Sequence, residues 1–326
     1  MSRIQQVLFQ LDAEYYGHPY YVTGNALYNA IAQRVESATR RALCVSHGVF
    51  LPGEYGSYPA WHSQSGSLGK IGSELPPVES YEDLFLLRDA AHRWLKSSRP
   101  RDVHNAHPMQ THGGRVTFAP VTWFGRPPEF ATSKRGVRWY VHCYLHAGSA
   151  VDDEILPVPA EVLDGLQVGG GRNYGFGALS HVDSQLIDTD ELSFDRLAAA
   201  DEHVIELISP FVTASSYPGA DDQSVPWWWD VARSDGRNGR VSDSTTEPTR
   251  DASDGLRRRA ERLAADGSVY EIETIDHGQR VGYAGDAPIE TAKNGVLRIG
   301  THARYGFGEL WVRPASDDRV SDRGDH

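Results

Sequence analysis

The sequence predicts an α+β protein made of two tandem ferredoxin-like (RRM-like) βαββαβ domains, each with a glycine-rich loop before its last strand. The main observation is an internal repeat. VGGGRNYGFGAL at 168–179 and RIGTHARYGFGEL at 298–310 both contain Tyr-Gly-Phe-Gly and continue into an apolar, strand-like segment. A second observation is that the chain opens with a strand followed by a helix, as a βαββαβ unit does.

The repeat also predicts the domain limits. Tyr174 and Tyr305, which begin the two tetrapeptides, lie about 130 residues apart in a chain of 326, which suits two copies of one domain type. We predict an N-terminal domain at 1–200 and a C-terminal domain at 201–326. Large loop insertions are expected in each domain, at about 50–135 and, with an acidic composition, at about 214–254.

The first domain begins with the predicted strand Gln6–Ala13 and a helix for which Thr23 is a suitable N-cap. Apolar residues recur on one face of that helix: Ala26, Leu27, Ala30, Ile31 and Val35. The stretch from His47 to Val78 is rich in Gly, Pro, Ser and Tyr and predicts a loop. A second helix is predicted from Ser80, with Leu84, Leu87, Ala91, Trp94 and Leu95 at helical spacing.

The clearest strand of the first domain is Val137–Leu145. Its alternation predicts an apolar face and a second face formed by Arg138, Tyr140, His142 and Tyr144. That second face has the composition of a sheet that stacks bases, although Tyr and His also occur on ordinary half-buried strands. A short helix at Pro159–Gln167, the first glycine loop and a strand through Ile187 complete the domain.

The second domain follows a linker or short helix at Asp188–Ala200. A strand is predicted at His203–Thr213, and the insertion after it contains three consecutive tryptophans, Trp227 to Trp229. Such rings can stack on bases, dock a partner or pack under their own domain, and we favour the last two. Gly255–Ala265 predicts a basic helix. Further strands are predicted at Val269–Ile275, Arg280–Tyr283, Val296–Ile299 and Leu310–Arg313.

The composition is acidic, with a formal net charge of −12, and lysine occurs only at positions 70, 96, 134 and 293. A nucleic-acid-binding protein is ordinarily basic, but this balance of Asp and Arg is typical of halophilic proteins. In molar salt counterion release contributes little, so such a protein would bind RNA through stacking, backbone hydrogen bonds and arginines. Its affinity is then expected to change little between moderate and molar KCl.

The sequence indicates no cofactor and no metal site. Cys44 and Cys143 are too few for a disulfide framework or a cysteine-based zinc site. His104, His107 and His112 share an irregular basic loop without a further ligand at a recognisable spacing, so we expect a solvated or RNA-contacting loop there. Without a signal peptide or a membrane-spanning apolar run, a cytoplasmic location is expected.

The two glycine loops are the candidate ligand-binding sites. Dense glycines permit positive φ and let backbone N–H groups approach an anion such as a phosphodiester. Bent hairpins would explain one such loop, but the recurrence with neighbouring Arg and Tyr favours binding. The predicted RNA-binding residues are Gly169, Gly170, Gly171, Arg172, Tyr174, Gly175 and Gly177 in the first loop, and Gly300, His302, Arg304, Tyr305, Gly306 and Gly308 in the second.

These loops, together with YYVTGNALYNAI at 20–31 and ELISPFV at 206–212, resemble the RAMP (repeat-associated mysterious protein) superfamily of CRISPR-associated RNA-binding proteins. The resemblance implies one or two ferredoxin-like domains with a glycine-rich loop before the final strand. It further implies that the chain binds the repeat-derived end of the CRISPR guide RNA as a non-catalytic subunit of an antiviral effector complex, with other effector subunits as partners.

The same superfamily offers an alternative function, a metal-independent endoribonuclease that processes precursor CRISPR RNA. The resemblance would place its catalytic pair at Tyr28, in the first helix, and His47, after that helix, with Lys70 a weaker third candidate. A histidine near neutrality can serve as acid or base in that reaction. Two loops support RNA binding and one residue pair supports RNA cleavage. We therefore rank the non-catalytic subunit, or scaffold, above the nuclease.

An unrelated enzyme that binds a nucleotide phosphate is a more distant alternative. No Walker lysine follows either glycine loop, and neither loop forms a G-x-G-x-x-G motif with an acidic ribose partner in a βαβ unit.

Overall fold

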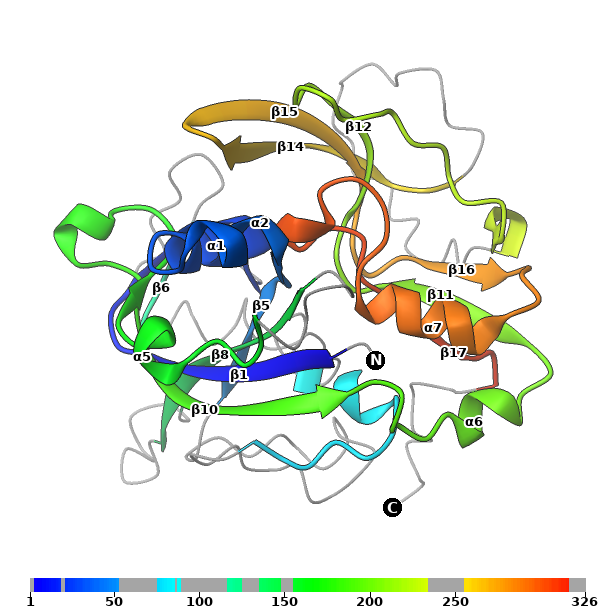
Figure 1. The fold of residues 1–326 in the computed structure, drawn as a ribbon, viewed down its shortest axis with the longest axis horizontal. Coiled ribbons are helices and arrows are strands. Elements are labelled where there is room, and N and C mark those ends of the chain that lie inside the picture. Colours follow the sequence, from blue (N-terminus) through cyan, green and yellow to red (C-terminus); the bar gives the residue numbers. More distant parts are fainter. Residues whose placement is uncertain are drawn as a thin grey trace, which may run out of the picture. The chain divides into compact units, whose positions relative to one another are not determined.

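The computed structural model describes residues 3–18, 21–52, 75–85, 87–88, 116–124, 135–147, 155–233 and 255–316. They form two compact units, which meet in the sequence between Ser193 and Phe194 (Figure 1). Both units are mixed α/β structures with antiparallel sheets and few helices among the described residues.

The first unit is built around one sheet in which the strands lie in the order β3-β5-β8-β1-β10-β9, with β4 and β7 also paired to β8. All of these pairings are antiparallel. The strands of this sheet are β1 (Arg3–Leu11), β3 (Tyr21–Val22), β4 (Leu43–Val45), β5 (Gly48–Pro52), β7 (Val121–Phe124), β8 (Arg135–Ala147), β9 (Leu166–Gln167) and β10 (Ala178–Asp188). Strands β2 (Tyr15–Gly17) and β6 (Val116–Phe118) pair with each other in a separate two-stranded sheet. The helices are α1 (Gly24–Ala32), α2 (Ser37–Ala42) and α5 (Ala160–Leu163).

Helix α1 begins where the sequence predicts. The Thr23 hydroxyl accepts a hydrogen bond from the Ala26 N–H, and Leu27 and Ile31 are buried. The helix ends at Ala32, so Val35 lies beyond it. The prediction of a loop from His47 to Val78 is wrong at its start, because the apolar residues of β5 pair with β8 there.

Strand β8 confirms the predicted strand, but the hypothesis that its Tyr/His face stacks bases is wrong. Tyr140, His142 and Tyr144 are buried, and the Tyr144 hydroxyl donates to the Leu84 carbonyl oxygen at 2.7 Å. The predicted second helix therefore covers this face. Its described residues are helical from Asp83, whereas Ala91, Trp94 and Leu95 lie outside the described residues.

The second unit contains a four-stranded sheet in the order β13-β16-β11-β17 and a three-stranded sheet in the order β12-β15-β14. The strands are β11 (His203–Leu207), β12 (Phe211–Ser215), β13 (Trp229–Asp230), β14 (Arg258–Ala265), β15 (Ser268–Ile275), β16 (Arg280–Tyr283) and β17 (Leu310–Pro314). The helices are α6 (Asp195–Ala198) and α7 (Pro288–Val296). The predicted strand at 203–213 is thus two strands, which belong to different sheets.

Two predictions in the second unit are wrong. The basic segment predicted as a helix is strand β14, which forms a hairpin with β15 through a two-residue turn. That turn is Asp266-Gly267, with φ of 50° and 77°, the conformation that Asp-Gly favours in tight hairpins. The strand predicted at Val296–Ile299 is instead the end of α7 and a turn, because Arg298 has φ of 62°.

Candidate nucleic-acid interface

The two glycine-rich loops have the same backbone. The first contains a short 3-10 turn, η3 (Arg172–Tyr174), and the second contains η5 (Ala303–Tyr305) at the equivalent position. Left-handed residues flank both turns at matching places: Gly169, Gly171, Gly175 and Gly177 in the first loop, and Gly300, His302, Gly306 and Gly308 in the second. The sequence repeat therefore corresponds to a structural repeat.

The last glycine of each loop closes it by hydrogen bonds. The Gly177 carbonyl oxygen accepts from the Val168 N–H at 2.9 Å, and the Gly308 carbonyl oxygen accepts from the Ile299 N–H at 3.1 Å. A Cβ atom at either glycine would lie 1.8 Å from the carbonyl oxygen of Val168 or Ile299. Both glycine N–H groups donate to backbone carbonyls, those of Glu14 and Pro210. These two glycines therefore hold the loops closed, and their N–H groups are already occupied.

The tip of the first loop is exposed. Tyr174 keeps 80% of its surface accessible, and Arg172 and Gly175 are exposed beside it. A Cβ added at Gly175 would meet nothing within 4 Å. Among the described residues, the Arg172 guanidinium has no hydrogen-bond or ion-pair partner, and neither do the backbone N–H groups of Gly171, Arg172 and Asn173. This tip presents one positive charge, several backbone donors and one aromatic ring to solvent.

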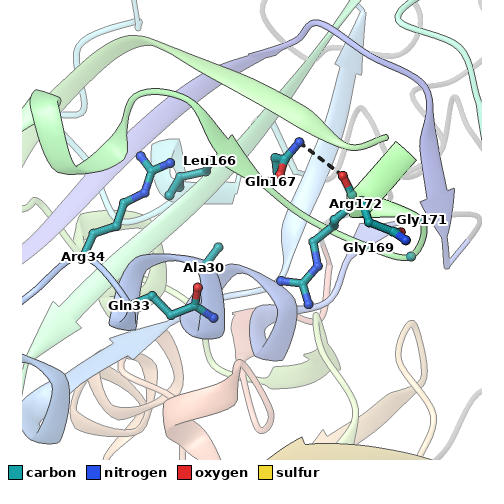
Figure 2. A pocket seen from close by; sticks show the side chains of 10 residues that line it. Ala30, Gln33, Arg34, Leu166, Gln167, Gly169, Gly171 and Arg172 are labelled. Carbon is teal, nitrogen blue, oxygen red and sulfur yellow. Dashed lines mark hydrogen bonds between the residues drawn. The ribbon is translucent and has the colours of Figure 1, made fainter. Parts of the chain in front are cut away.

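The first loop borders an open pocket of about 650 Å³. Figure 2 shows the Arg172 side chain extending from the loop toward α1, with Gln33 at the end of that helix. Other lining residues are Ala30, Arg34, Leu166, Gln167, Gly169, Gly170, Gly171 and Asn173. The pocket is polar and contains two arginines, so it suits an anion with hydrogen-bonding groups, such as a phosphate and its ribose.

Arg34 is held in place by the backbone beneath the pocket. Its guanidinium donates to the carbonyl oxygens of Val162, in α5, and of Asp164 and Gly165, which join α5 to β9. These bonds fix the positive charge of Arg34, which lines the same pocket as the exposed Arg172 but lies on its opposite side (Figure 2). No sequence motif selects Arg34 or Gln33, because it is the packing of α1 beside β9 that brings the end of this helix to the glycine loop.

The second loop is packed against its own unit. Tyr305 is 6% exposed, and the His302 Nε2 atom lies 2.7 Å from the Ser215 hydroxyl of β12. The Tyr217 ring meets the His302 ring edge-on at 5.3 Å. Burial lowers the pKa of His302 below its ordinary value. Arg304 is half-buried. The aromatic and imidazole groups predicted to bind RNA in this loop are engaged in internal contacts.

The proposed catalytic pair lies in the first unit, with each side chain bound to a different partner. The Tyr28 hydroxyl donates to the Arg40 carbonyl oxygen at 2.8 Å, and the residue is 7% exposed. His47 is 4% exposed, and its Nδ1 accepts a hydrogen bond from the Gly24 N–H at 3.3 Å. Lys70 lies outside the described residues. In this arrangement, both side chains support the packing of α1.

A buried polar network beneath β8 was not foreseen from the sequence. The Arg88 guanidinium donates to the Ser46 hydroxyl and to the His47 carbonyl oxygen, and it lies 5.1 Å from the centre of the Tyr144 ring. Burial lowers the pKa of Arg88 to about 10. The pKa of His142 is lowered first by burial and then by the charge of Arg88. Because these groups are fully enclosed, the network ties the 75–88 segment to the sheet.

Among the described residues, no group of three or more His, Cys, Asp or Glu side chains is placed to hold a metal ion. His104, His107 and His112 lie outside those residues. None of the described helices has the length and apolar character needed to cross a bilayer.

A scan against models of known protein families finds no match, and no curated protein matches the sequence. Among solved structures, the chain is similar to one named CRISPR associated protein Cas6, with a TM-score of 0.36 and 10% identity over 95% of this chain and 98% of that chain. It is also similar to a crystal structure of a Csm1-Csm4 cassette in complex with cA3, with a TM-score of 0.28 and 10% identity over 87% and 88% of the two chains. At these TM-scores we base no argument on either similarity.

Proposed function

We propose that this chain is a CRISPR-associated RAMP protein that binds the repeat-derived end of a guide RNA as a non-catalytic subunit of an antiviral effector complex. The observation that supports binding is the first glycine loop, which exposes Arg172, Tyr174 and unpartnered backbone donors beside a pocket with a second arginine. In this proposal Arg172 and the backbone N–H groups bind a phosphate, and Tyr174 stacks on a base.

The strand order supports the proposal of two tandem ferredoxin-like domains. In the first unit, β1, β5, β8 and β10 are the first to fourth strands of such a domain and lie in the order 4-1-3-2. In the second unit, β11, β13, β16 and β17 lie in the same order. The second unit departs from the βαββαβ pattern at one place, because the described residues between β11 and β13 contain strand β12 and no α-helix.

The RNA-binding surface is proposed to centre on the first loop, because its tip has both the charge and the free ring. The second loop has a matching backbone but contributes less, since Tyr305 is buried and His302 contacts Ser215. In this proposal both loops contact the RNA, and the first loop contributes more to the binding affinity than the second.

The test is binding of a CRISPR repeat RNA to the Arg172→Ala variant. Loss of a charge-assisted contact should weaken binding about 10-fold. Arg262→Ala is the matched control, because Arg262 is an exposed arginine on β14, away from both loops in the sequence. Equal affinities for the two variants and the unmodified chain would contradict a binding role for the first loop.

The nuclease alternative is less well supported, because His47 and Tyr28 are buried and bonded to backbone groups. Incubating the protein with repeat RNA in EDTA separates the two functions. The scaffold proposal expects stable binding without cleavage. Specific cleavage that is lost in His47→Ala would establish the nuclease instead.

A further inference from the structure

A second pocket, in the C-terminal unit, has a different chemistry from the one at the first loop. Its volume is about 500 Å³, within the range of small-molecule sites. The segment 222–228 forms one wall and helix α7 forms another. The lining residues are Phe211, Asp222, Gln223, Ser224, Pro226, Trp228, Thr291, Asn294, Ile299 and Gly300.

The pocket combines aromatic rings with uncharged hydrogen-bonding groups. Trp228 and Phe211 provide ring surfaces, and Thr291 and Asn294 project from the same face of α7, three residues apart. The described lining residues include one carboxylate, Asp222, and no lysine or arginine. A phosphate would therefore be repelled here, whereas a flat heterocycle with N–H donors would be accepted.

Several of these polar groups are available to a ligand. Among the described residues, the side chains of Asp222, Gln223 and Ser224 have no hydrogen-bond partner. Gln223 is nevertheless fixed in position, since its backbone N–H donates to the Thr213 carbonyl oxygen at 2.7 Å. Its Oε1 atom lies 2.5 Å from where a Cβ of Gly300 would be, so the absence of a side chain at Gly300 makes room for the amide.

The three consecutive tryptophans differ in burial, and this difference shows which ring is available to a ligand in the pocket. Trp229 is buried against Phe211, with ring centres 5.2 Å apart. Trp227 is 77% exposed and is not among the lining residues. Trp228 is half-buried at the pocket, where its ring packs edge-on against that of Trp229. Of the three rings, Trp228 is thus the one placed to stack on a bound heterocycle.

We infer that this pocket binds a single nucleobase, stacked on Trp228 and hydrogen-bonded at its edge by the side chains of Gln223, Asn294 and Asp222. Amide and carboxylate groups are the ones that recognise base edges in single-stranded RNA. The base comes from the bound RNA or from a free nucleotide, and the chemistry of the pocket is the same for both. For an RNA base, the inference rests on the proposed function.

The experiment measures binding of a repeat RNA, of the same RNA with single abasic positions, and of free adenosine and cytidine. Trp228→Ala should weaken RNA binding about 10-fold or more, and Trp227→Ala, the matched control, should leave it unchanged. One abasic position in the RNA should reproduce the loss and should not add to Trp228→Ala. Saturable nucleoside binding that Trp228→Ala abolishes, with RNA affinity unchanged, would assign the pocket to a free nucleotide.

Two further variants guard against a folding defect. Trp228→Phe keeps a ring and should restore most of the affinity, and Asn294→Ala changes an exposed residue on α7 and should lower affinity without altering thermal stability. If Trp228→Ala binds RNA and nucleosides as Trp227→Ala does, the nucleobase pocket is refuted. If the pocket is refuted in this way but Arg172→Ala still weakens RNA binding, the RNA-binding proposal stands without the pocket.

Discussion

The two glycine loops share a backbone and differ in what surrounds them. In both, a left-handed glycine, Gly177 or Gly308, closes the loop by hydrogen bonds to the residue nine positions earlier, Val168 or Ile299. At the tips the loops diverge, since Tyr174 is 80% exposed and Tyr305 is 6% exposed. The comparison teaches that the Tyr-Gly-Phe-Gly repeat specifies a backbone, and that the availability of its side chains depends on the neighbouring elements.

The largest effect is expected at the closing glycines. Gly177→Ala and Gly308→Ala place a Cβ 1.8 Å from a backbone carbonyl oxygen at positive φ, so each should cost about 4 kcal/mol or more of unfolding free energy. Gly175→Ala is the matched control, with no atom within 4 Å of the added Cβ, and should cost only about 1 kcal/mol from its left-handed conformation. Urea denaturation measures all three. Equal losses at Gly175 and Gly177 would contradict the closing role.

The second effect should separate the two tyrosines. Tyr305→Ala removes a buried ring and should destabilise the protein by about 3 to 5 kcal/mol, as for other large-to-small changes in a core. Tyr174→Ala removes an exposed ring and should change stability by no more than about 0.5 kcal/mol. Tyr174→Ala should instead weaken RNA binding by about 1 to 3 kcal/mol. Thermal denaturation and RNA titration of both variants check this prediction. An RNA affinity unaffected by Tyr174→Ala would contradict a binding role for the exposed ring.

A smaller effect is expected at the contact that packs the second loop. Ser215→Ala removes the hydroxyl that lies 2.7 Å from His302 Nε2 and should cost about 1 kcal/mol of stability. Ser180→Ala serves as the control. The Ser180 hydroxyl donates to the Asp12 carboxylate within the first unit, so its removal should not affect the second unit. Hydrogen exchange of the second loop reports the change locally. Unchanged protection at 302–306 in Ser215→Ala would show that this contact does not hold the loop.

The smallest effect is a pH dependence. Because the pKa of His302 is lowered in the folded state, the unfolded state binds more protons between the two pKa values. The contribution of His302 to stability is therefore complete above its ordinary pKa and is lost as the pH falls toward the folded value. His302→Asn keeps a residue that tolerates positive φ and removes the titration. Urea midpoints should fall less on acidification in His302→Asn, and an identical fall would exclude His302 as a contributor.

The sequence predicted the parts of the fold that depend on local signals. The Thr23 cap, the strand β8 and the repeated loops all have local causes, and the structure has each of them. The Asp266-Gly267 turn is also a local signal, whereas the charge pattern of the Arg-rich segment before it predicts a helix. Recognition of that turn would have predicted the β14–β15 hairpin.

The rest could not be predicted because it depends on tertiary packing. Both faces of β8 are buried, and no pattern in the strand indicates that the 75–88 segment covers Tyr144. Arg34 is held at the pocket by carbonyl oxygens of α5 and of the residues between α5 and β9, which are far from it in the sequence. Similarly, the exposure of Tyr174 and the burial of Tyr305 follow from different surroundings of nearly identical sequences.

The most direct measurement of the central claim is ultraviolet cross-linking of a bound repeat RNA, with the modified residues identified by mass spectrometry. The account predicts a cross-link at Tyr174, on the exposed tip of the first loop, that is stronger than any at Tyr305. Cross-links confined to surfaces away from 168–179, with Tyr174 unmodified while RNA remains bound, would contradict it.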